Sequence, residues 1–317
     1  MRVTDPAELL AAAQAGDRSA IARLISLVER GGHAASEVSR LTWPAARKAA
    51  LIGLTGSPGA GKSTLTNTLV AHLRERGERV AVLAIDPSSP FTNGAILGDR
   101  VRMQDHATDD GVFIRSMATR GQVGGLALAT PEAARVLGAA GYPTVLIETV
   151  GVGQVEVEIA GAADTTVVVV NPGWGDAVQA NKAGLLEVAD VFVINKADRP
   201  GVAEVRRDLE AMLDMHVALG PWRPPIVEAV AARNEGAAGV WEAIDAHRAH
   251  MLETGELERR QAKRAEAEVR EIVVRTIEAK AIAVLKSDDG TALTAKVTDG
   301  SIDPHEAAES ILRELEA

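Results

Sequence analysis

The chain contains no cysteine among its 317 residues. Without cysteine the protein has no disulfide bonds, no thiolate metal ligands and no thiol nucleophile, which is compatible with a reducing compartment. It also lacks an apolar run near the roughly 20 residues that span a bilayer, and its amino terminus is polar and acidic rather than apolar. These features predict a soluble, cytoplasmic protein with no membrane partner.

A dense block of lysine and arginine is also missing. The 34 Lys and Arg residues are outnumbered by 44 Asp and Glu residues, so the formal net charge is −10. A nucleic-acid duplex would meet net repulsion from such a chain. We therefore expect no nucleic-acid partner.

A glycine-rich octet follows an apolar, β-rich run and precedes a helical pattern. It fits G-x-x-x-x-G-K-[ST], in which backbone N–H groups surround phosphate oxygens while the lysine and hydroxyl reach the terminal phosphates and Mg²⁺. The N-terminus of the following helix also favours an anion. The predicted phosphate-binding residues are Gly56, Ser57, Pro58, Gly59, Ala60, Gly61, Lys62 and Ser63.

A second motif, Asn195-Lys196-Ala197-Asp198, follows another apolar run. Asp198 can accept hydrogen bonds from N1–H and the exocyclic N2–H of guanine, Asn195 can bond the opposite edge, and the Lys196 stem can lie along the ring. Adenine offers neither donor, so it would leave the carboxylate unpaired. Taken alone, the segment could instead cap a helix. Combined with the phosphate loop it predicts a GTP site.

The central part of the chain alternates between β-rich runs and helical patterns. The runs cover 51–55, 80–85, 112–115, 144–149, 165–170, 191–194 and 226–230. This alternation predicts an α/β fold of the P-loop NTPase type, with a largely parallel sheet covered by helices on both faces. In such sheets, ligands bind beyond the carboxyl ends of the strands.

Helical segments flank this core. Asp5 to Glu8 form a capping box, which predicts two short helices over 5–30, and residues 31–50 are expected to lead into the first strand. The expected organisation is an N-terminal helical extension over 1–48 and a GTPase domain over 49–252.

The remaining segment, 253–317, is expected to form a C-terminal helical arm. A charged helix over 257–285 keeps an apolar face and would reach about 40 Å, more than a compact domain needs. This favours packing on a second subunit, so we expect a dimerisation arm in a homodimer. The alternative is a helix pair folded back on its own domain. The last helix is expected to open with a capping box at Asp303.

Carboxylates follow two of the predicted strands. Asp86 and Glu148 would both lie at the sheet edge that holds the phosphate loop. Mg²⁺ prefers oxygen ligands and keeps several waters, so such carboxylates typically hold it through water while Ser63 binds directly. Asp86 could instead be a turn residue before proline.

Three further segments suggest nucleotide-dependent switching. Gly151 can approach a γ-phosphate oxygen closely, and Gln154 could orient the attacking water, although it stands three residues past the glycine. Two polar loops, 88–105 with Asp99 and 171–176 with Asp176, can also move. For Asp99, Asp176 and Lys182 a plain loop role stays open. Without an obvious water-orienting glutamine next to Gly151, slow intrinsic turnover with stimulation by a partner is expected.

In order and spacing, these motifs resemble the methylmalonyl-CoA mutase-associated GTPases, the MeaB/ArgK group. The matching segments are 56–64, 86–89, 96–100, 148–154 and 195–198. The resemblance implies a homodimeric G-protein chaperone that gates adenosylcobalamin loading and protects or reactivates an acyl-CoA mutase. It also implies that Thr64 joins the phosphate and Mg²⁺ site with Lys62 and Ser63.

For the remaining positions the resemblance implies metal-shell and switch roles. Asp86, Asp99 and Glu148 would serve the metal and the switches, and Asp176 and Lys182 would communicate with the partner and the hydrolytic site. One departure concerns the base: many G proteins place Ser-Ala after the last strand, whereas this chain has Glu228 to Ala232, so backbone amides near Ala231 would support the base.

Two other function classes are compatible with these motifs. Nickel-delivering metallochaperone GTPases share the sheet and the nucleotide chemistry, but they need Cys/His clusters, and the seven histidines here are scattered. A P-loop metabolite kinase, including the arginine-transport role that the name ArgK suggests, need not carry the guanine motif.

Overall fold

The computed structural model describes residues 5–45, 48–86, 106, 108–118, 129–149, 155–173, 187–215 and 221–316. Within these residues the helices are α1 (Pro6–Gln14), α2 (Arg18–Arg30), α3 (Gly32–Thr42), α4 (Lys62–Glu75), α5 (Ala129–Ala139), α6 (Val155–Ala162), α8 (Val202–Met215), α9 (Ala237–Thr254), α10 (Glu256–Leu285), α11 (Asp288–Thr298) and α12 (Pro304–Glu316). Two short 3-10 helices are η1 (Trp43–Ala45) and η3 (Ala231–Arg233).

The strands are β1 (Ala50–Gly56), β2 (Val80–Asp86), β3 (Val112–Ala118), β4 (Thr144–Thr149), β5 (Thr165–Val170), β6 (Val191–Asn195) and β7 (Ile226–Ala229). They form one sheet in the order β3-β2-β4-β1-β5-β6-β7, and every neighbouring pair is parallel. The seven predicted β-rich runs and the parallel sheet are therefore confirmed. Because the strands are parallel, their carboxyl ends meet at one edge.

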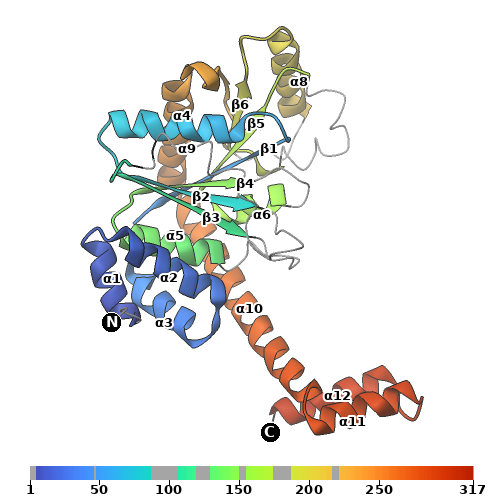
Figure 1. Cartoon of the computed structure of the whole chain (residues 1–317). Coiled ribbons are helices and arrows are strands. Elements are labelled where there is room, and N and C mark those ends of the chain that lie inside the picture. The colour runs from blue at the N-terminus through green and yellow to red at the C-terminus, as the bar shows by residue number, and fades with distance from the viewer. Residues whose placement is uncertain are drawn as a thin grey trace. The chain divides into compact units, whose positions relative to one another are not determined.

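Helices cover both faces of this sheet (Figure 1). On one face, α4 and α9 pack on alternate residues of the strands, including Leu54 and Val169. On the other face, α5 and α6 pack on β2, β4 and β1, and α8 packs on Val168 and Phe192. A sheet that is covered by helices on both faces requires strands whose residues are apolar on both faces, as these strands are.

The N-terminal helices α1 to α3 pack on one another, and α2 and α3 pack on α5. The Asp5 carboxylate caps α1 by accepting from the N–H groups of Ala7 (2.8 Å) and Glu8 (3.1 Å), as the capping box predicts. The two helices predicted over 5–30 are present as α1 and α2, and a third helix that was not predicted from the sequence, α3, precedes the first strand. Gly31 ends α2 with φ 72°, and α3 begins directly after it. Ala35 and Val38 form the buried apolar face of α3.

The chain divides into two compact units, Met1–Gln261 and Ala262–Ala317. The second unit contains the remainder of α10 followed by α11 and α12, which pack together. Asp303 caps α12 as predicted, accepting from the N–H groups of His305 (2.6 Å) and Glu306 (3.1 Å). Among the residues that the structure describes, no helix is both long enough and apolar enough to cross a membrane.

Candidate functional site

The phosphate loop connects β1 to α4 at the carboxyl edge of the sheet. Gly56 has φ 132°, and a Cβ added there would lie 2.1 Å from the Val169 carbonyl oxygen, so only glycine fits against β5. Gly61 precedes α4 with φ 93°, where an added Cβ would lie 2.3 Å from Asn195 Nδ2. These two glycines let the loop turn tightly and expose its N–H groups next to the helix N-terminus.

Lys62 is buried at the base of this loop. Its Nζ donates to the carbonyl oxygens of Gly56 (2.7 Å) and Ser57 (3.1 Å), and the residue is 7% exposed. An ammonium group held against the loop lies where a phosphate bound by the loop would meet it. The structure therefore brings the predicted lysine and the loop backbone together.

The oxygen ligands expected for a metal also lie side by side. The Ser63 hydroxyl, in the first turn of α4, donates to Glu148 Oε1 near the end of β4, and both residues are buried. β4 pairs directly with β1, so Leu54 stands opposite Glu148. A hydroxyl and a carboxylate at the phosphate loop are hard oxygen donors of the kind that Mg²⁺ prefers.

Asn195 and Lys196 connect the phosphate loop to the guanine motif. Asn195 is 2% exposed, and its Nδ2 donates to the carbonyl oxygens of Ala60 (2.9 Å) and Gly61 (3.4 Å). Its Oδ1 accepts from the Ala231 N–H (3.1 Å), and Lys196 Nζ donates to the Gly59 carbonyl (2.6 Å). In this geometry the Asn195 amide connects the backbones of two loops, the phosphate loop and the segment after β7, and acts as a positioning group between the phosphate end and the base end.

Asp198 lies in the turn after β6 and forms an ion pair with Arg233, with 3.2 Å between Arg233 Nη2 and Asp198 Oδ2. Ala231 is the first residue of η3, and its carbonyl accepts from the Thr68 hydroxyl (3.0 Å). The structure therefore places Ala231 beside Asn195, and the Ala231 N–H donates to the Asn195 side chain.

Several predicted site residues lie outside the described part of the chain. These are Asp99, Gly151, Gln154, Lys182 and the switch residue Asp176. Asp86 is the last residue of β2, but its side chain is also outside the described part.

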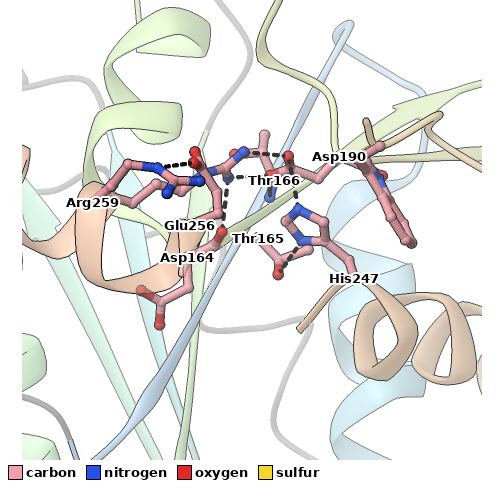
Figure 2. Close-up of polar contacts among 9 residues, drawn as sticks. Asp164, Thr165, Thr166, Asp190, His247, Glu256 and Arg259 are labelled. Carbon is pink, nitrogen blue, oxygen red and sulfur yellow. Dashed lines mark hydrogen bonds and ion pairs between the residues drawn. The ribbon is translucent and has the colours of Figure 1, made fainter. Parts of the chain in front are cut away.

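Sequence reasoning missed a buried polar cluster at the opposite edge of the sheet (Figure 2). Asp190, just before β6, accepts from the Thr166 N–H (2.8 Å) and from both terminal nitrogens of Arg260 (2.9 Å each). His247 of α9 lies between Asp190 (3.2 Å from Nε2) and the Thr165 hydroxyl (2.9 Å from Nδ1). We call this group the Asp190 cluster.

The Asp190 cluster fixes the start of α10 to the sheet. Arg260 also donates to the Asp164 carbonyl oxygen (2.9 Å), and the Asp164 carboxylate accepts from the Leu51 N–H at the start of β1 (2.9 Å). Burial lowers the pKa of His247 to about 4, which the Asp190 carboxylate opposes and the Arg260 guanidinium favours. His247 is therefore neutral near pH 7 and donates from Nε2 to Asp190.

The fold and the carboxyl-edge site together define a P-loop GTPase. A phosphate loop, a buried lysine, a hydroxyl–carboxylate pair and a guanine motif occur at one edge of a parallel sheet.

Comparison with known proteins gives the family. The family profile described as "Methylmalonyl Co-A mutase-associated GTPase MeaB" matches residues 21–286, so the chain belongs to the MeaB family. This confirms the resemblance stated above, and with it GTP hydrolysis as the activity.

Individual relatives agree with this assignment. A Pyrococcus abyssi protein that carries the name of a GTPase is 49% identical, covering 97% of this chain and 96% of the relative. The GTPase ArgK of Escherichia coli is 36% identical, covering 80% of this chain and 78% of its own. The crystal structure of a LAO/AO transport system kinase matches with a TM-score of 0.71 at 26% identity, covering 100% of this chain and 99% of that one.

Proposed function

We propose that this GTPase is a chaperone of an adenosylcobalamin-dependent acyl-CoA mutase, gating cofactor loading and protecting or reactivating the mutase. The observation that carries the proposal is the family match over residues 21–286, whose description names methylmalonyl-CoA mutase. A relative from Mus musculus, the mitochondrial methylmalonic aciduria type A homolog, is 38% identical, covering 65% of this chain and 51% of its own.

In the nucleotide site, the proposal assigns phosphate binding to residues 56–64, where Lys62 would exchange a loop carbonyl for the β- and γ-phosphate oxygens. Ser63 would bind Mg²⁺ directly, and Glu148, with Asp86 and Asp99, would hold its water shell. A bound Mg²⁺ supplies positive charge to the phosphate oxygens on which negative charge develops. The roles of Gly151 and Gln154 in switching and hydrolysis stay predictions from the sequence, and that of Lys182 stays a prediction from the resemblance.

At the base end, Asp198 would accept from guanine N1–H and N2–H. Asn195 and Lys196 would hold the base motif at a fixed spacing from the phosphate loop, because both donate to its carbonyl groups. Fixing the two ends before binding reduces the ordering cost when the nucleotide binds.

The second copy of a homodimer would bind through α10. Within the second unit, Val269, Ile272, Val273 and Ile277 lie at helical spacing and are 44–62% exposed. An exposed apolar stripe of this kind is typical of an interface. Ile272→Glu should shift the mass measured by light scattering from dimer to monomer, and an unchanged dimer would exclude this surface.

The chaperone role is tested by measuring GTP turnover with and without candidate cobalamin mutases, together with co-elution. The client should increase turnover and co-elute in a nucleotide-dependent way, whereas Lys62→Ala should show neither basal nor stimulated turnover. If no adenosylcobalamin-dependent mutase changes turnover or co-elutes, the chaperone proposal is wrong, although the GTPase assignment stands.

A second candidate is a metabolite kinase, favoured only by the name of the solved LAO/AO transport system kinase. Transfer of the γ-phosphate of labelled GTP to an added basic amino acid, rather than to water, would support it. The metallochaperone alternative also stays a prediction. Among the residues that the structure describes, no group of three or more His, Cys, Asp or Glu side chains could hold a metal ion. Calorimetry with Ni²⁺ tests it.

A further inference from the structure

The loop after β7 is folded tightly beside the guanine motif. Val230 and Glu235 bond each other in both directions, with N···O distances of 3.1 and 3.3 Å. Between them, η3 ends at Arg233, and Asn234 closes the turn with φ 57°. We call residues 230–236 the β7 loop. Its backbone bonds leave Arg233 in one restricted position on the turn.

Two contacts fix the β7 loop to the rest of the site. The Ala231 N–H donates to Asn195 Oδ1 (3.1 Å), and the Ala231 carbonyl accepts from the Thr68 hydroxyl of α4 (3.0 Å). Of the backbone amides near Ala231 that were expected to support the base, the N–H of Ala231 itself is therefore bonded to Asn195.

Arg233 is the side chain of this loop that meets the guanine motif. Its Nη2 lies 3.2 Å from Asp198 Oδ2, with the Arg233 side chain 59% and the Asp198 side chain 33% exposed. The Asp198 turn is itself fixed, because the Ala197 N–H donates to the Ala229 carbonyl (3.0 Å) and the Arg199 N–H to the Lys196 carbonyl (3.0 Å). Two fixed turns thus meet through one ion pair.

The chemistry of a carboxylate allows Arg233 and a base to bind Asp198 together. Two carboxylate oxygens offer about four lone-pair positions, and the single Arg233 contact uses one of them. Guanine needs two more. A guanidinium is also planar and weakly hydrated, so it stacks readily on an aromatic ring.

We propose that Arg233 is a specificity-determining positioning residue for guanine. It holds the Asp198 carboxylate in one orientation, so that the remaining lone pairs face the base, and it places a planar cation at the rim of the base site. This inference rests on the proposed role of Asp198 in reading guanine. It explains how a chain with Ala231-Ala232 where many G proteins have Ser-Ala can still recognise the base.

Removing this pair should leave the fold intact, because partly exposed ion pairs contribute little to stability. Its effect should appear in binding. Freeing the Asp198 side chain adds an ordering cost and weakens charge-assisted recognition, so Arg233→Met is expected to weaken GDP binding about five- to tenfold. ADP, which has no donors for Asp198, should bind as weakly as before.

Arg206→Met is the matched control. Arg206 donates from Nε to Glu228 Oε1 on β7 (2.9 Å), and its side chain is also partly exposed, at 34%. The Arg206→Met substitution removes the arginine–carboxylate pair at Glu228 on β7 and leaves the contacts of Asp198 unchanged. Dissociation constants for GDP and ADP and the unfolding temperature are measured for the wild type and both variants, and also in the Asp198→Asn background.

The expected result is a five- to tenfold loss of GDP affinity in Arg233→Met only, which disappears in the Asp198→Asn background. The inference is overturned if Arg233→Met leaves GDP affinity unchanged or tightens it, or if ADP affinity falls equally. It is also overturned if Arg206→Met gives the same loss. If Asp198→Asn itself leaves the preference for GDP over ADP intact, the proposed guanine site fails instead.

Discussion

Replacing Arg260 by methionine tests whether the Asp190 cluster stabilises the GTPase unit. Methionine keeps most of the apolar stem but removes both bonds to the Asp190 carboxylate and the bond to the Asp164 carbonyl. Asp190 has 7% side-chain exposure and would retain the Thr166 N–H and His247 as partners. A buried charge would thus lose its only guanidinium partner among the contacts described.

The size of the effect follows from burial. Removing one partner of a fully buried ion pair typically lowers the free energy of unfolding by about 3–5 kcal/mol. This range is the upper limit for the loss of Arg260. The Arg260 side chain is 30% exposed, so water can replace part of the lost interaction. We therefore expect a loss of about 2–3 kcal/mol, which lowers the unfolding temperature by roughly 5–10 °C for a domain of this size.

The assay is thermal unfolding followed by circular dichroism, with Arg259→Met as the control. Arg259 neighbours Arg260 and pairs with the same Glu256, but its side chain is 64% exposed, so its loss should cost less than about 0.5 kcal/mol. If Arg260→Met and Arg259→Met unfold at the same temperature, the cluster does not stabilise the unit and the reasoning is refuted.

Two further predictions concern the phosphate loop and the pH dependence of stability. Gly61→Ala should abolish tight GDP binding measured by calorimetry, because the added Cβ would meet Asn195 Nδ2 at 2.3 Å, whereas Gly161→Ala, where a Cβ meets nothing within 4 Å, should bind normally. The pKa of His247 is lowered to about 4 by burial, so the unfolded chain takes up its proton first as the pH falls. The contribution of neutral His247 to the free energy of unfolding is therefore complete above about pH 6.5. As the pH falls toward 4 this contribution is lost, and the free energy of unfolding decreases by up to about 3 kcal/mol. The fall in urea midpoint between pH 7 and pH 4.5 should be smaller in His247→Gln, and equal falls would contradict the assignment.

The strands and the carboxyl-edge site could be predicted because their signals are local. Each β-rich run is apolar enough to be buried on both faces, and a parallel sheet then brings Lys62, Glu148 and Asp198 to one edge without further information. Helix α3 was missed because Gly31 precedes it, Gly32 is its first residue and its apolar face is short. In this case the burial of Ala35 and Val38 decides the structure rather than the local sequence signal.

The contacts that depend on distant residues could not be predicted. Arg260 and Asp190 are 70 positions apart, and Arg260 stands in a charged stretch that resembles a solvated helix. The Arg233 pair likewise depends on how the β7 loop closes beside β6. Nothing in the spacing of these residues along the chain indicates such tertiary pairs.

The most direct test of the central claim, that one edge of the sheet selects a guanine nucleotide, is the nucleotide preference of Asp198→Asn. Binding of GDP, XDP and ADP is measured by calorimetry in the wild type and the variant. Asparagine presents an N–H group toward guanine donors but can donate to the oxygen of xanthine, so GDP affinity should fall by about 100-fold or more while XDP affinity rises. An Asp198→Asn variant that still prefers GDP would contradict the account.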